Sequence, residues 1–157
     1  MNAILLAGGF GKRLRPITNE TPKCLVPINN KPLIEFWIDN LRNSNIENTL
    51  INTHYLADKV TDFFKNHPFK ENIHLSHEEK LLGTAGTLKK NINFFGKRED
   101  GLLIHADNFC QEEIKNLIRS HQNRPKQCLI TMMTFKTDSP SSCGIVEVDE
   151  NNIDCQI

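Results

Sequence analysis

The sequence predicts an α/β fold in three layers, in which a mostly parallel sheet carries helices on both faces. Short apolar runs of strand length alternate with longer segments whose apolar residues recur at helical spacing. The order is strand and helix four times over, followed by a fifth strand. Such alternation is typical of parallel sheets, because consecutive parallel strands need a crossover that a helix usually supplies. We expect one domain over residues 1–157, a length that suits a single core.

Five apolar segments are expected to form the strands. The first is bounded by glycine, and the others share its short length. They cover residues 2–8, 48–55, 73–78, 101–107 and 127–135. Ligands of parallel α/β folds bind at the carboxyl ends of the strands. The loops after the first, third and fourth strands are therefore the candidate binding loops.

Four segments between and after these strands are expected to be helices. They cover residues 31–45, 56–67, 84–95 and 111–122. The first has Pro32 in its first turn, where proline is tolerated. Its expected core stripe consists of Leu33, Phe36, Trp37 and Leu41. The inward residues of the second are expected to be Leu56, Val60, Phe63 and Phe64.

The overall charge gives no reason to expect nucleic acid or membrane as a partner. Lys plus Arg number 19 and Asp plus Glu number 19, so the formal net charge is zero. No apolar run approaches the ~18 residues needed to span a bilayer. The first residues have no basic region ahead of their apolar stretch, so we expect a strand there and not a signal peptide.

The five cysteines are scattered, odd in number and without a C-x-x-C pair. This usage suggests neither a zinc site nor a disulfide framework. We therefore expect a reducing, cytoplasmic setting. Cys24 lies near the glycine-rich loop and is expected to be a small packed residue.

The loop after the first strand gathers glycines and cations. Gly8, Gly9 and Gly11 let the backbone approach a ligand closely, and consecutive free N–H groups in such a loop form an anion-binding concavity. Between residues 8 and 23 the local charge balance is 4 − 1 = +3. The charged residues are Lys12, Arg13, Arg15, Lys23 and Glu20. A polyphosphate is the natural partner for such a loop.

Two common phosphate-binding motifs do not fit this loop. A P-loop has Ser or Thr after its lysine, whereas Arg13 follows Lys12 here. The dinucleotide fingerprint has a third glycine where this chain has Leu14.

The segment LLAGGFGKRLRPITNETPKCLVPINNKP, residues 5–32, closely resembles the signature of the sugar-phosphate nucleotidyltransferases, or NDP-sugar pyrophosphorylases. The residues in register are Gly8, Gly9, Gly11, Arg13, Leu14, Pro16, Thr18, Pro22, Lys23, Lys31 and Pro32. The resemblance runs from residue 2 to about residue 154. It implies a Rossmann-like, GT-A-like fold and transfer of a nucleotidyl group from an NTP to a sugar-1-phosphate, with release of pyrophosphate.

The loop SHEEKLLGTAG, residues 76–86, resembles the guanylyltransferase branch of that family, the mannose-1-phosphate type. The resemblance implies that this loop closes over the base. Glu78 stands five residues before Gly83, where thymidylyl and uridylyl enzymes usually have Gln. A carboxylate accepts both adjacent donors of guanine, so we expect Glu78 to read that base. A solvated charge at the end of the strand is the alternative.

Asp107 follows the fourth strand and is the expected ligand of Mg²⁺. The family pattern has Gly-Asp here, whereas Ala106 precedes Asp107 in this chain. The alternative is a helix-capping role. His105 is expected to pack inside the strand.

The implied mechanism is in-line attack of the sugar phosphate on the α-phosphorus, with Arg13, Lys23 and Asp107 as catalytic residues. Arg13 would hold the departing pyrophosphate, and Lys23 would steady the phosphates around the transferring group. The expected nucleotide-binding residues are Leu6, Ala7, Gly8, Gly9, Gly11, Lys12, Arg13, Lys23, Glu78, Gly83 and Thr84. Asn108 and Gly144 are the expected contacts to the sugar substrate.

The end of the chain resembles only the start of a sugar-binding portion. Residues 143–157 are expected to form a hairpin with its turn at residues 150–152. Relatives are expected to continue with a Glu-Lys-Pro strand and a second metal-binding Asp. We expect a truncated nucleotidyltransferase domain that lacks the distal sugar-binding portion, binds nucleotide and turns over poorly, if at all.

The expected function is therefore transfer of a guanylyl group from GTP to mannose- or heptose-1-phosphate, with Mg²⁺ as cofactor. Two alternatives stay open: a uridylyl- or thymidylyltransferase acting on glucose-1-phosphate, and a non-catalytic nucleotide-binding module. Assembly into a homo-oligomer is left open as well.

Overall fold

The computed structural model describes residues 1–97 and 99–150 of the chain. These residues group into two compact units, Met1–Glu112 and a second unit that begins at Glu113. The first unit contains a four-stranded sheet in the order β5-β4-β1-β6. Its strands are β1 (Asn2–Leu6), β4 (Thr49–Thr53), β5 (Ile73–His77) and β6 (Gly101–His105). All three pairings between neighbours are parallel, as the alternation of strand and helix predicts.

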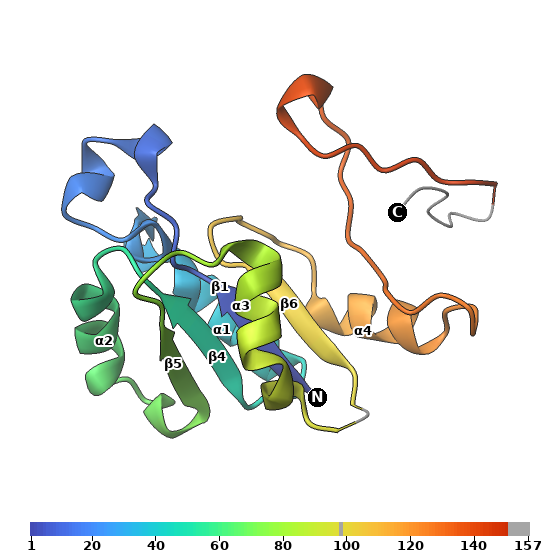
Figure 1. Ribbon diagram of the computed structural model, residues 1–157, viewed down its shortest axis with the longest axis horizontal. Coiled ribbons are helices and arrows are strands. Elements are labelled where there is room, and N and C mark those ends of the chain that lie inside the picture. Colours follow the sequence, from blue (N-terminus) through green and yellow to red (C-terminus); the bar gives the residue numbers. More distant parts are fainter. Residues whose placement is uncertain (98, 151–157) are drawn as a thin grey trace. The chain divides into compact units, whose positions relative to one another are not determined.

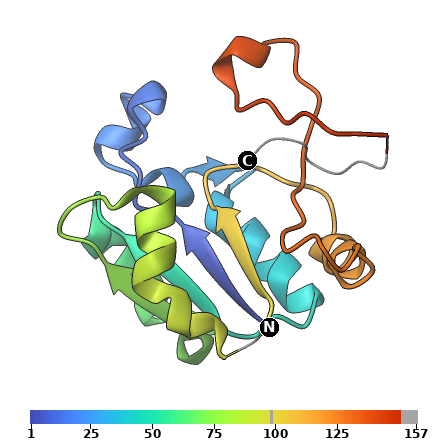
Figure 2. The same cartoon turned by 45° about the vertical axis from the view of Figure 1, so that its right-hand side comes forward.

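Helices cover both faces of this sheet. α3 (Gly83–Asn91) lies in front of the sheet in Figure 1, whereas α1 (Leu33–Asn43) lies behind it. The rotated view in Figure 2 shows the same two sides. α2 (Ala57–Lys65) follows β4 in the chain. The three-layer α/β architecture expected from the sequence is confirmed.

Short elements occupy the loops of the first unit. The 3-10 turns are η1 (Lys12–Leu14), η2 (Ile17–Asn19), η3 (Lys23–Leu25), η4 (Lys70–Asn72) and η5 (Ile92–Phe95). A small antiparallel pair joins β2 (Pro27–Ile28) to β3 (Lys31–Pro32). This pair leads directly into α1. Pro32 was expected in the first turn of the helix, but it belongs to β3, and the helix begins one residue later, at Leu33.

The core lies around β1 and α1. Ala3, Ile4 and Leu5 of β1 are fully buried, because β1 has a strand on each side and helices cover both faces of the sheet. The buried residues of α1 are Leu33, Ile34, Trp37, Ile38 and Leu41. Phe36 was expected on this stripe but is only half-buried, and its ring meets Phe109 edge-on at 5.2 Å between centroids.

In α2, Val60 and Phe64 are buried as expected, whereas Leu56 and Phe63 are half-buried. Leu56 precedes the helix and has a left-handed backbone. It therefore does not continue the helical stripe that the spacing predicts.

The second unit contains α4 (Ile114–Gln122), as expected, and the 3-10 turn η6 (Pro140–Ser142). The expected fifth strand over residues 127–135 is wrong. That segment is irregular, and Leu129, Ile130 and Phe135 are more than three-quarters exposed. An apolar run becomes a strand only when it forms a ladder with a partner, and this one forms no ladder with any described residue.

The expected terminal hairpin is tested only in part. Its first half contains no strand through residue 150. Its return segment, residues 151–157, lies outside the described residues. Among the described residues, no helix is long and apolar enough to cross a membrane.

Ile51 provides a test of this core, because it is fully buried in β4. We expect Ile51→Ala to lower the free energy of unfolding by about 2–5 kcal/mol and Ile51→Val by about 0.5–1.5 kcal/mol. Urea unfolding followed by circular dichroism measures both. The matched control is Ile130→Ala in the second unit, which is 78% exposed and should shift the unfolding free energy by less than about 0.5 kcal/mol. Equal losses at the two positions would contradict this description of the core.

Candidate functional site

A cavity of about 290 Å³ opens in the first unit, where β1 and β6 end. Its walls come from the glycine-rich loop, the turns η1 and η3, the end of β4 and the start of α3. The lining residues are Leu6, Ala7, Gly8, Gly9, Gly11, Lys12, Arg13, Leu14, Lys23, Cys24, Asn52, Leu81, Gly83, Thr84, Thr87, His105 and Asp107. The cavity thus lies at the edge of the sheet where ligands of parallel α/β folds bind.

The structure brings together most of the residues singled out from the sequence. The predicted residues that line the cavity are Leu6, Ala7, Gly8, Gly9, Gly11, Lys12, Arg13, Lys23, Gly83, Thr84 and Asp107. Glu78, Asn108 and Gly144 do not line it. Asn108 is exposed next to Asp107, and its carbonyl oxygen accepts a hydrogen bond from Trp37 Nε1 at 2.8 Å. Gly144 belongs to the second unit, and the sugar contacts stay predictions.

The register of the sheet explains why polar groups meet at the cavity. Leu6, the last residue of β1, pairs with Asn52 of β4 on one side and with His105 of β6 on the other. Because the three strands are parallel, their chains leave the sheet on the same edge. Asn52, His105 and the glycine-rich loop therefore lie at one level.

Gly11 shapes the glycine-rich loop by its backbone conformation. Its φ is +61°, a left-handed value that residues with a side chain rarely adopt. A Cβ at Gly11 would stand 2.9 Å from Thr18 Cγ2, closer than real Cβ contacts come. Thr18 Oγ1 donates a hydrogen bond to the Gly11 carbonyl at 2.7 Å and so closes the loop upon itself.

Two side chains from the region of α2 hold the far end of this loop. Tyr55 Oη donates to the Thr18 carbonyl at 2.9 Å, and Lys59 Nζ donates to the Glu20 carbonyl. The loop is therefore fastened at both ends, which reduces the conformational entropy that it would lose on binding a ligand.

The backbone amides of the loop fall into two groups. Those of Ala7 and Gly8 donate to Asn52 Oδ1 at 2.7 and 3.2 Å. The Gly8 amide, which was expected among the free N–H groups of the loop, is therefore already used within the protein. No partner within the described residues accepts from the amides of Gly9 and Gly11, which also line the cavity. These two amides are available to an anionic ligand.

The cavity lining carries an excess of positive charge. Lys12, Arg13 and Lys23 line it against a single carboxylate among the lining residues, that of Asp107. Lys23 Nζ lies 2.7 Å from Asp107 Oδ2, so this pair is locally neutral. Lys12 and Arg13 form no ion pair within the described chain. Arg15 does not line the cavity, so the local charge available to a ligand comes from the other cations.

Asp107 has the chemistry for holding a metal ion, but it would need help from the ligand. No cluster of three or more His, Cys, Asp or Glu side chains occurs in the described residues. Mg²⁺ is commonly held by one or two carboxylates together with phosphate oxygens of a substrate. The half-exposed carboxylate of Asp107 fits that arrangement, because a phosphate held by the neighbouring cations would supply the further oxygen ligands.

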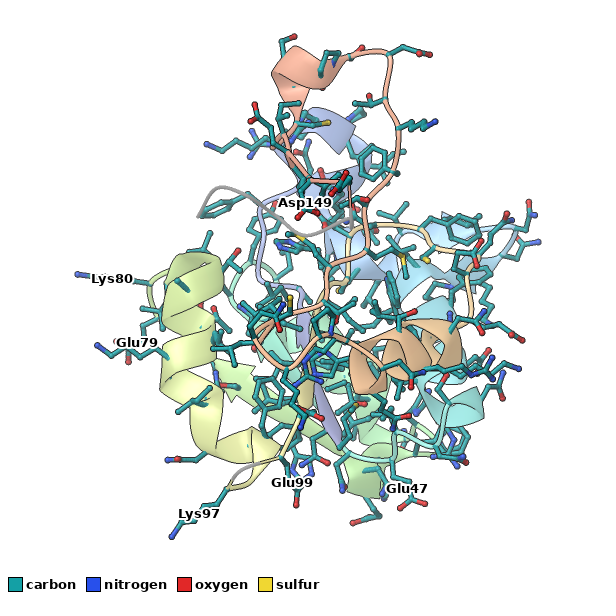
Figure 3. The ribbon with its side chains drawn as sticks, turned by 90° about the vertical axis from the view of Figure 1, so that its right-hand side faces the viewer. Glu47, Glu79, Lys80, Lys97, Glu99 and Asp149 are labelled. Carbon is teal, nitrogen blue, oxygen red and sulfur yellow. The ribbon has the colours of Figure 1, made fainter. Side chains whose placement is uncertain are left out.

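Glu78 is buried, with only 2% of its surface exposed, whereas Glu79 and Lys80 beside it point to solvent in Figure 3. Its carboxylate accepts hydrogen bonds from Thr87 Oγ1, Asn52 Nδ2 and the Leu82 amide. The alternative of a solvated charge is therefore wrong. The oxygens of Glu78 already accept from the protein, and the residue lies outside the cavity lining. This placement does not support base reading by Glu78, which stays a prediction.

The pKa of Glu78 reflects two opposed effects. Burial raises it, because a charge is poorly solvated inside a protein. The hydrogen bonds from Thr87, the Leu82 amide and Asn52, with the charge of Lys90, lower the pKa by more, so that the net shift is downward. The carboxylate is therefore ionised at neutral pH.

Two cavity residues differ from what the sequence suggested. His105 was expected to pack, but it is exposed and lines the cavity, because Ile104 and Ala106 on either side of it take the buried positions. Asn52 was not singled out at all. The signal was an asparagine directly after the apolar pair Leu50 and Ile51 of an expected strand, because an amide side chain that is buried there requires hydrogen-bond partners.

Cys24 is buried, as expected for a packed residue. Burial raises the pKa of its thiol to about 12. The thiol is therefore protonated at neutral pH, which makes it a poor nucleophile.

Comparison with known proteins identifies relatives of this chain. Residues 2–156 match the family model described as nucleotidyl transferase. The chain is 34% identical over 153 residues to mannose-1-phosphate guanylyltransferase catalytic subunit beta of Drosophila melanogaster, covering 95% of this chain and 41% of that protein. It is 30% identical over 153 residues to D-glycero-alpha-D-manno-heptose 1-phosphate guanylyltransferase of Campylobacter jejuni, covering 98% of this chain and 66% of that protein.

A solved structure shares the fold. HddC from Yersinia pseudotuberculosis, complexed with GMP-PN, superposes with a TM-score of 0.67 at 26% identity, over 78% of this chain and 54% of that chain. The chain thus spans between 41% and 66% of the length of the two curated relatives.

Gly11→Ala tests the loop geometry. We expect it to lower the free energy of unfolding by about 1–3 kcal/mol, because alanine at that left-handed φ is strained and meets Thr18. Gly9→Ala is the matched control, since a Cβ there meets nothing within 4 Å. Its effect should stay within about 0.5 kcal/mol. Urea unfolding measures both, and a larger loss for Gly9→Ala would refute the loop conformation.

The lowered pKa of Glu78 predicts a pH dependence of stability. A carboxyl whose pKa is lower in the folded state stabilises the fold above its unfolded pKa, near 4.5, and loses that contribution as the pH falls through the folded value. The difference in unfolding free energy between wild type and Glu78→Gln should therefore grow as the pH rises from 3 and level off above about 5. Glu79→Gln, at an exposed neighbour, should show no such trend. A pH-independent difference for Glu78→Gln would contradict the hydrogen-bonded carboxylate.

Proposed function

Because the chain belongs to the nucleotidyl transferase family, we propose that its first unit binds the triphosphate of an NTP in the glycine-lined cavity and serves transfer of a guanylyl group to a sugar-1-phosphate. The observation that carries this proposal is the joint presence of free loop amides and unpaired cations in one cavity. Amides and Arg or Lys side chains are the groups that proteins use to bind phosphates.

The proposed roles follow from position in the cavity. Arg13 binds the departing pyrophosphate, because its guanidinium offers forked donors and has no carboxylate partner in the described chain. Lys23 contacts the phosphates near Asp107. Asp107, together with phosphate oxygens, would hold Mg²⁺, which neutralises charge that develops on the phosphates.

Guanine is the proposed base, and mannose- or heptose-1-phosphate the proposed acceptor. The support is the names of the two curated relatives, which are both guanylyltransferases. Uridylyl or thymidylyl transfer is the alternative within the class, and nucleotide binding without turnover is the alternative outside it. We place this function in the cytoplasm, because the cysteines are scattered, odd in number and without a C-x-x-C pair, a usage that suggests no disulfide framework.

A thermal-shift panel of GTP, ATP, UTP, CTP and dTTP with Mg²⁺ tests the proposal directly. A nucleotide at 100 times its dissociation constant should stabilise the fold by about 2.7 kcal/mol. Lys23→Ala and Arg13→Ala should each weaken binding of the stabilising nucleotide roughly 10- to 100-fold, the value of a charge-assisted hydrogen bond of ~1.5–3 kcal/mol. Lys89→Ala, an exposed cation of α3 outside the cavity lining, is the control and should bind as wild type does.

The outcomes separate the readings. A shift selective for GTP supports the guanylyl proposal, and formation of a GDP-sugar from mannose-1-phosphate or heptose-1-phosphate then tests the transfer. Selectivity for UTP or dTTP replaces guanine as the base. Absence of any shift from a folded sample rejects nucleotide binding by this chain.

A further inference from the structure

Asn52 connects the first strand to a buried carboxylate. Its Oδ1 accepts from the amides of Ala7 and Gly8, at 2.7 and 3.2 Å. Its Nδ2 donates to Glu78 Oε1 at 3.1 Å. The oxygen of the Asn52 amide therefore accepts from the loop, and its NH₂ group donates to the carboxylate. Asn52 itself is only 3% exposed.

This arrangement defines which way the Asn52 amide points. Two N–H donors face one end, so that end must be the oxygen. An ionised carboxylate accepts hydrogen bonds but cannot donate one, so the end that faces Glu78 must be the NH₂ group. A flipped amide would leave two buried N–H groups against an NH₂ group and a carbonyl oxygen against a carboxylate. Glu78 thus selects the orientation in which Asn52 holds the loop.

Glu78 is in turn held from several elements. Thr87 Oγ1 of α3 donates to Oε1 at 2.6 Å, and the Leu82 amide donates to Oε2 at 3.1 Å. Its own backbone amide donates to the Thr53 carbonyl at the end of β4, at 2.9 Å. The carboxylate therefore joins the end of β4 to the start of α3, where Gly83 and Thr84 line the cavity.

Gly8 shows how closely Asn52 approaches the loop. A Cβ at Gly8 would stand 3.1 Å from Asn52 Nδ2 and 3.2 Å from Leu81 Cδ1. The side chains of Asn52 and Leu81 therefore limit the space in which the loop begins. Burying a carboxylate costs free energy unless its oxygens accept hydrogen bonds. The Glu78 carboxylate meets this condition, because Asn52, Thr87 and the Leu82 amide all donate to it.

We propose that Glu78 and Asn52 are positioning residues, which together set the path of the glycine-rich loop and tie it to the start of α3. Asn52 holds the amides of Ala7 and Gly8, which directs the following amides of Gly9 and Gly11 into the cavity. Glu78 acts through Asn52 and not through the ligand. The part of this inference that concerns ligand affinity rests on the proposed nucleotide binding, whereas the part that concerns the loop does not.

This role differs in its consequences from direct base reading. If Glu78 contacted the base, Glu78→Gln would change which nucleotide binds best. A positioning role leaves the order of the five nucleotides unchanged and weakens all of them by the same factor, because the triphosphate is common to all.

The first measurement uses the free protein. Hydrogen exchange and amide proton shifts of Ala7 and Gly8 are recorded by NMR for wild type and Asn52→Ala. We expect exchange at these two amides to accelerate by about 10-fold or more, because their shared acceptor is removed. Asn2→Ala is the matched control: Asn2 lies at the opposite end of β1 and donates to the Phe94 carbonyl at 2.7 Å. It should leave both amides as they are in wild type.

The second measurement exchanges the donor and the acceptor in the hydrogen bond between residues 52 and 78. Asn52→Asp retains acceptors for Ala7 and Gly8 but sets a second carboxylate against Glu78, so nucleotide affinity should fall by about 10-fold or more. The double variant Asn52→Asp with Glu78→Gln restores a donor opposite the new carboxylate. Its affinity should return to within about 3-fold of wild type. Glu35→Gln is the control for loss of a carboxylate, because Glu35 pairs with His67 and does not line the cavity. It should leave affinity unchanged.

Each result decides a separate point. Unchanged exchange at Ala7 and Gly8 in folded Asn52→Ala would overturn the positioning role, as would a double variant no better than Asn52→Asp alone. A changed order of nucleotides in Glu78→Gln would overturn it in favour of base reading.

If wild type binds no nucleotide, the proposed function fails, and the exchange data still decide whether Asn52 holds the loop. If Asn52→Ala does not fold, Asn52→Leu, which removes the same acceptor but keeps most of the side-chain volume, decides the same question by the exchange of Ala7 and Gly8.

Discussion

The cavity depends on the position of β1 at the centre of a parallel sheet. β1 pairs with β4 on one side and with β6 on the other, and its residues Ala3, Ile4 and Leu5 are fully removed from solvent. A strand buried in this way must end in a loop, and parallel neighbours end on the same edge. The hydrophobic core and the candidate site therefore depend on the same strand. Burial fixes the position of β1, and the end of β1 fixes where the glycine-rich loop begins.

The charge of the cavity differs from the net charge of the whole chain. The chain carries 19 cationic and 19 acidic side chains, yet three cations and one carboxylate line the cavity. Lys23 and Asp107 neutralise each other when no ligand is bound, so a phosphate or a metal ion would compete for partners that are already in place. The buried carboxylate of Glu78 is used differently, because its hydrogen bonds go to the protein and hold the wall of the cavity.

Local sequence patterns correctly predicted the strands and helices whose buried residues recur at regular spacing. The apolar runs at β1, β4, β5 and β6 are strands, and the stripe that includes Leu33, Trp37 and Leu41 is the buried face of α1. The same kind of pattern was misleading over residues 127–135, which are irregular. Strand formation requires a ladder with another segment, and the identity of that segment is not encoded in the run itself.

The sequence by itself determined the fold class, the position of the glycine-rich loop and the residue types that suit a phosphate, because glycine conformation, cation chemistry and apolar periodicity are local properties. Only the tertiary structure decided which residues face one another. Strand register brought Asn52 and His105 level with the end of β1, and burial turned Glu78 inward while its neighbour Glu79 stayed in solvent. These outcomes depend on contacts between residues that are 26 or more positions apart, such as Asn52 with Glu78 and Ala7 with Asn52. No local pattern records such contacts, because they arise only when separate elements pack together.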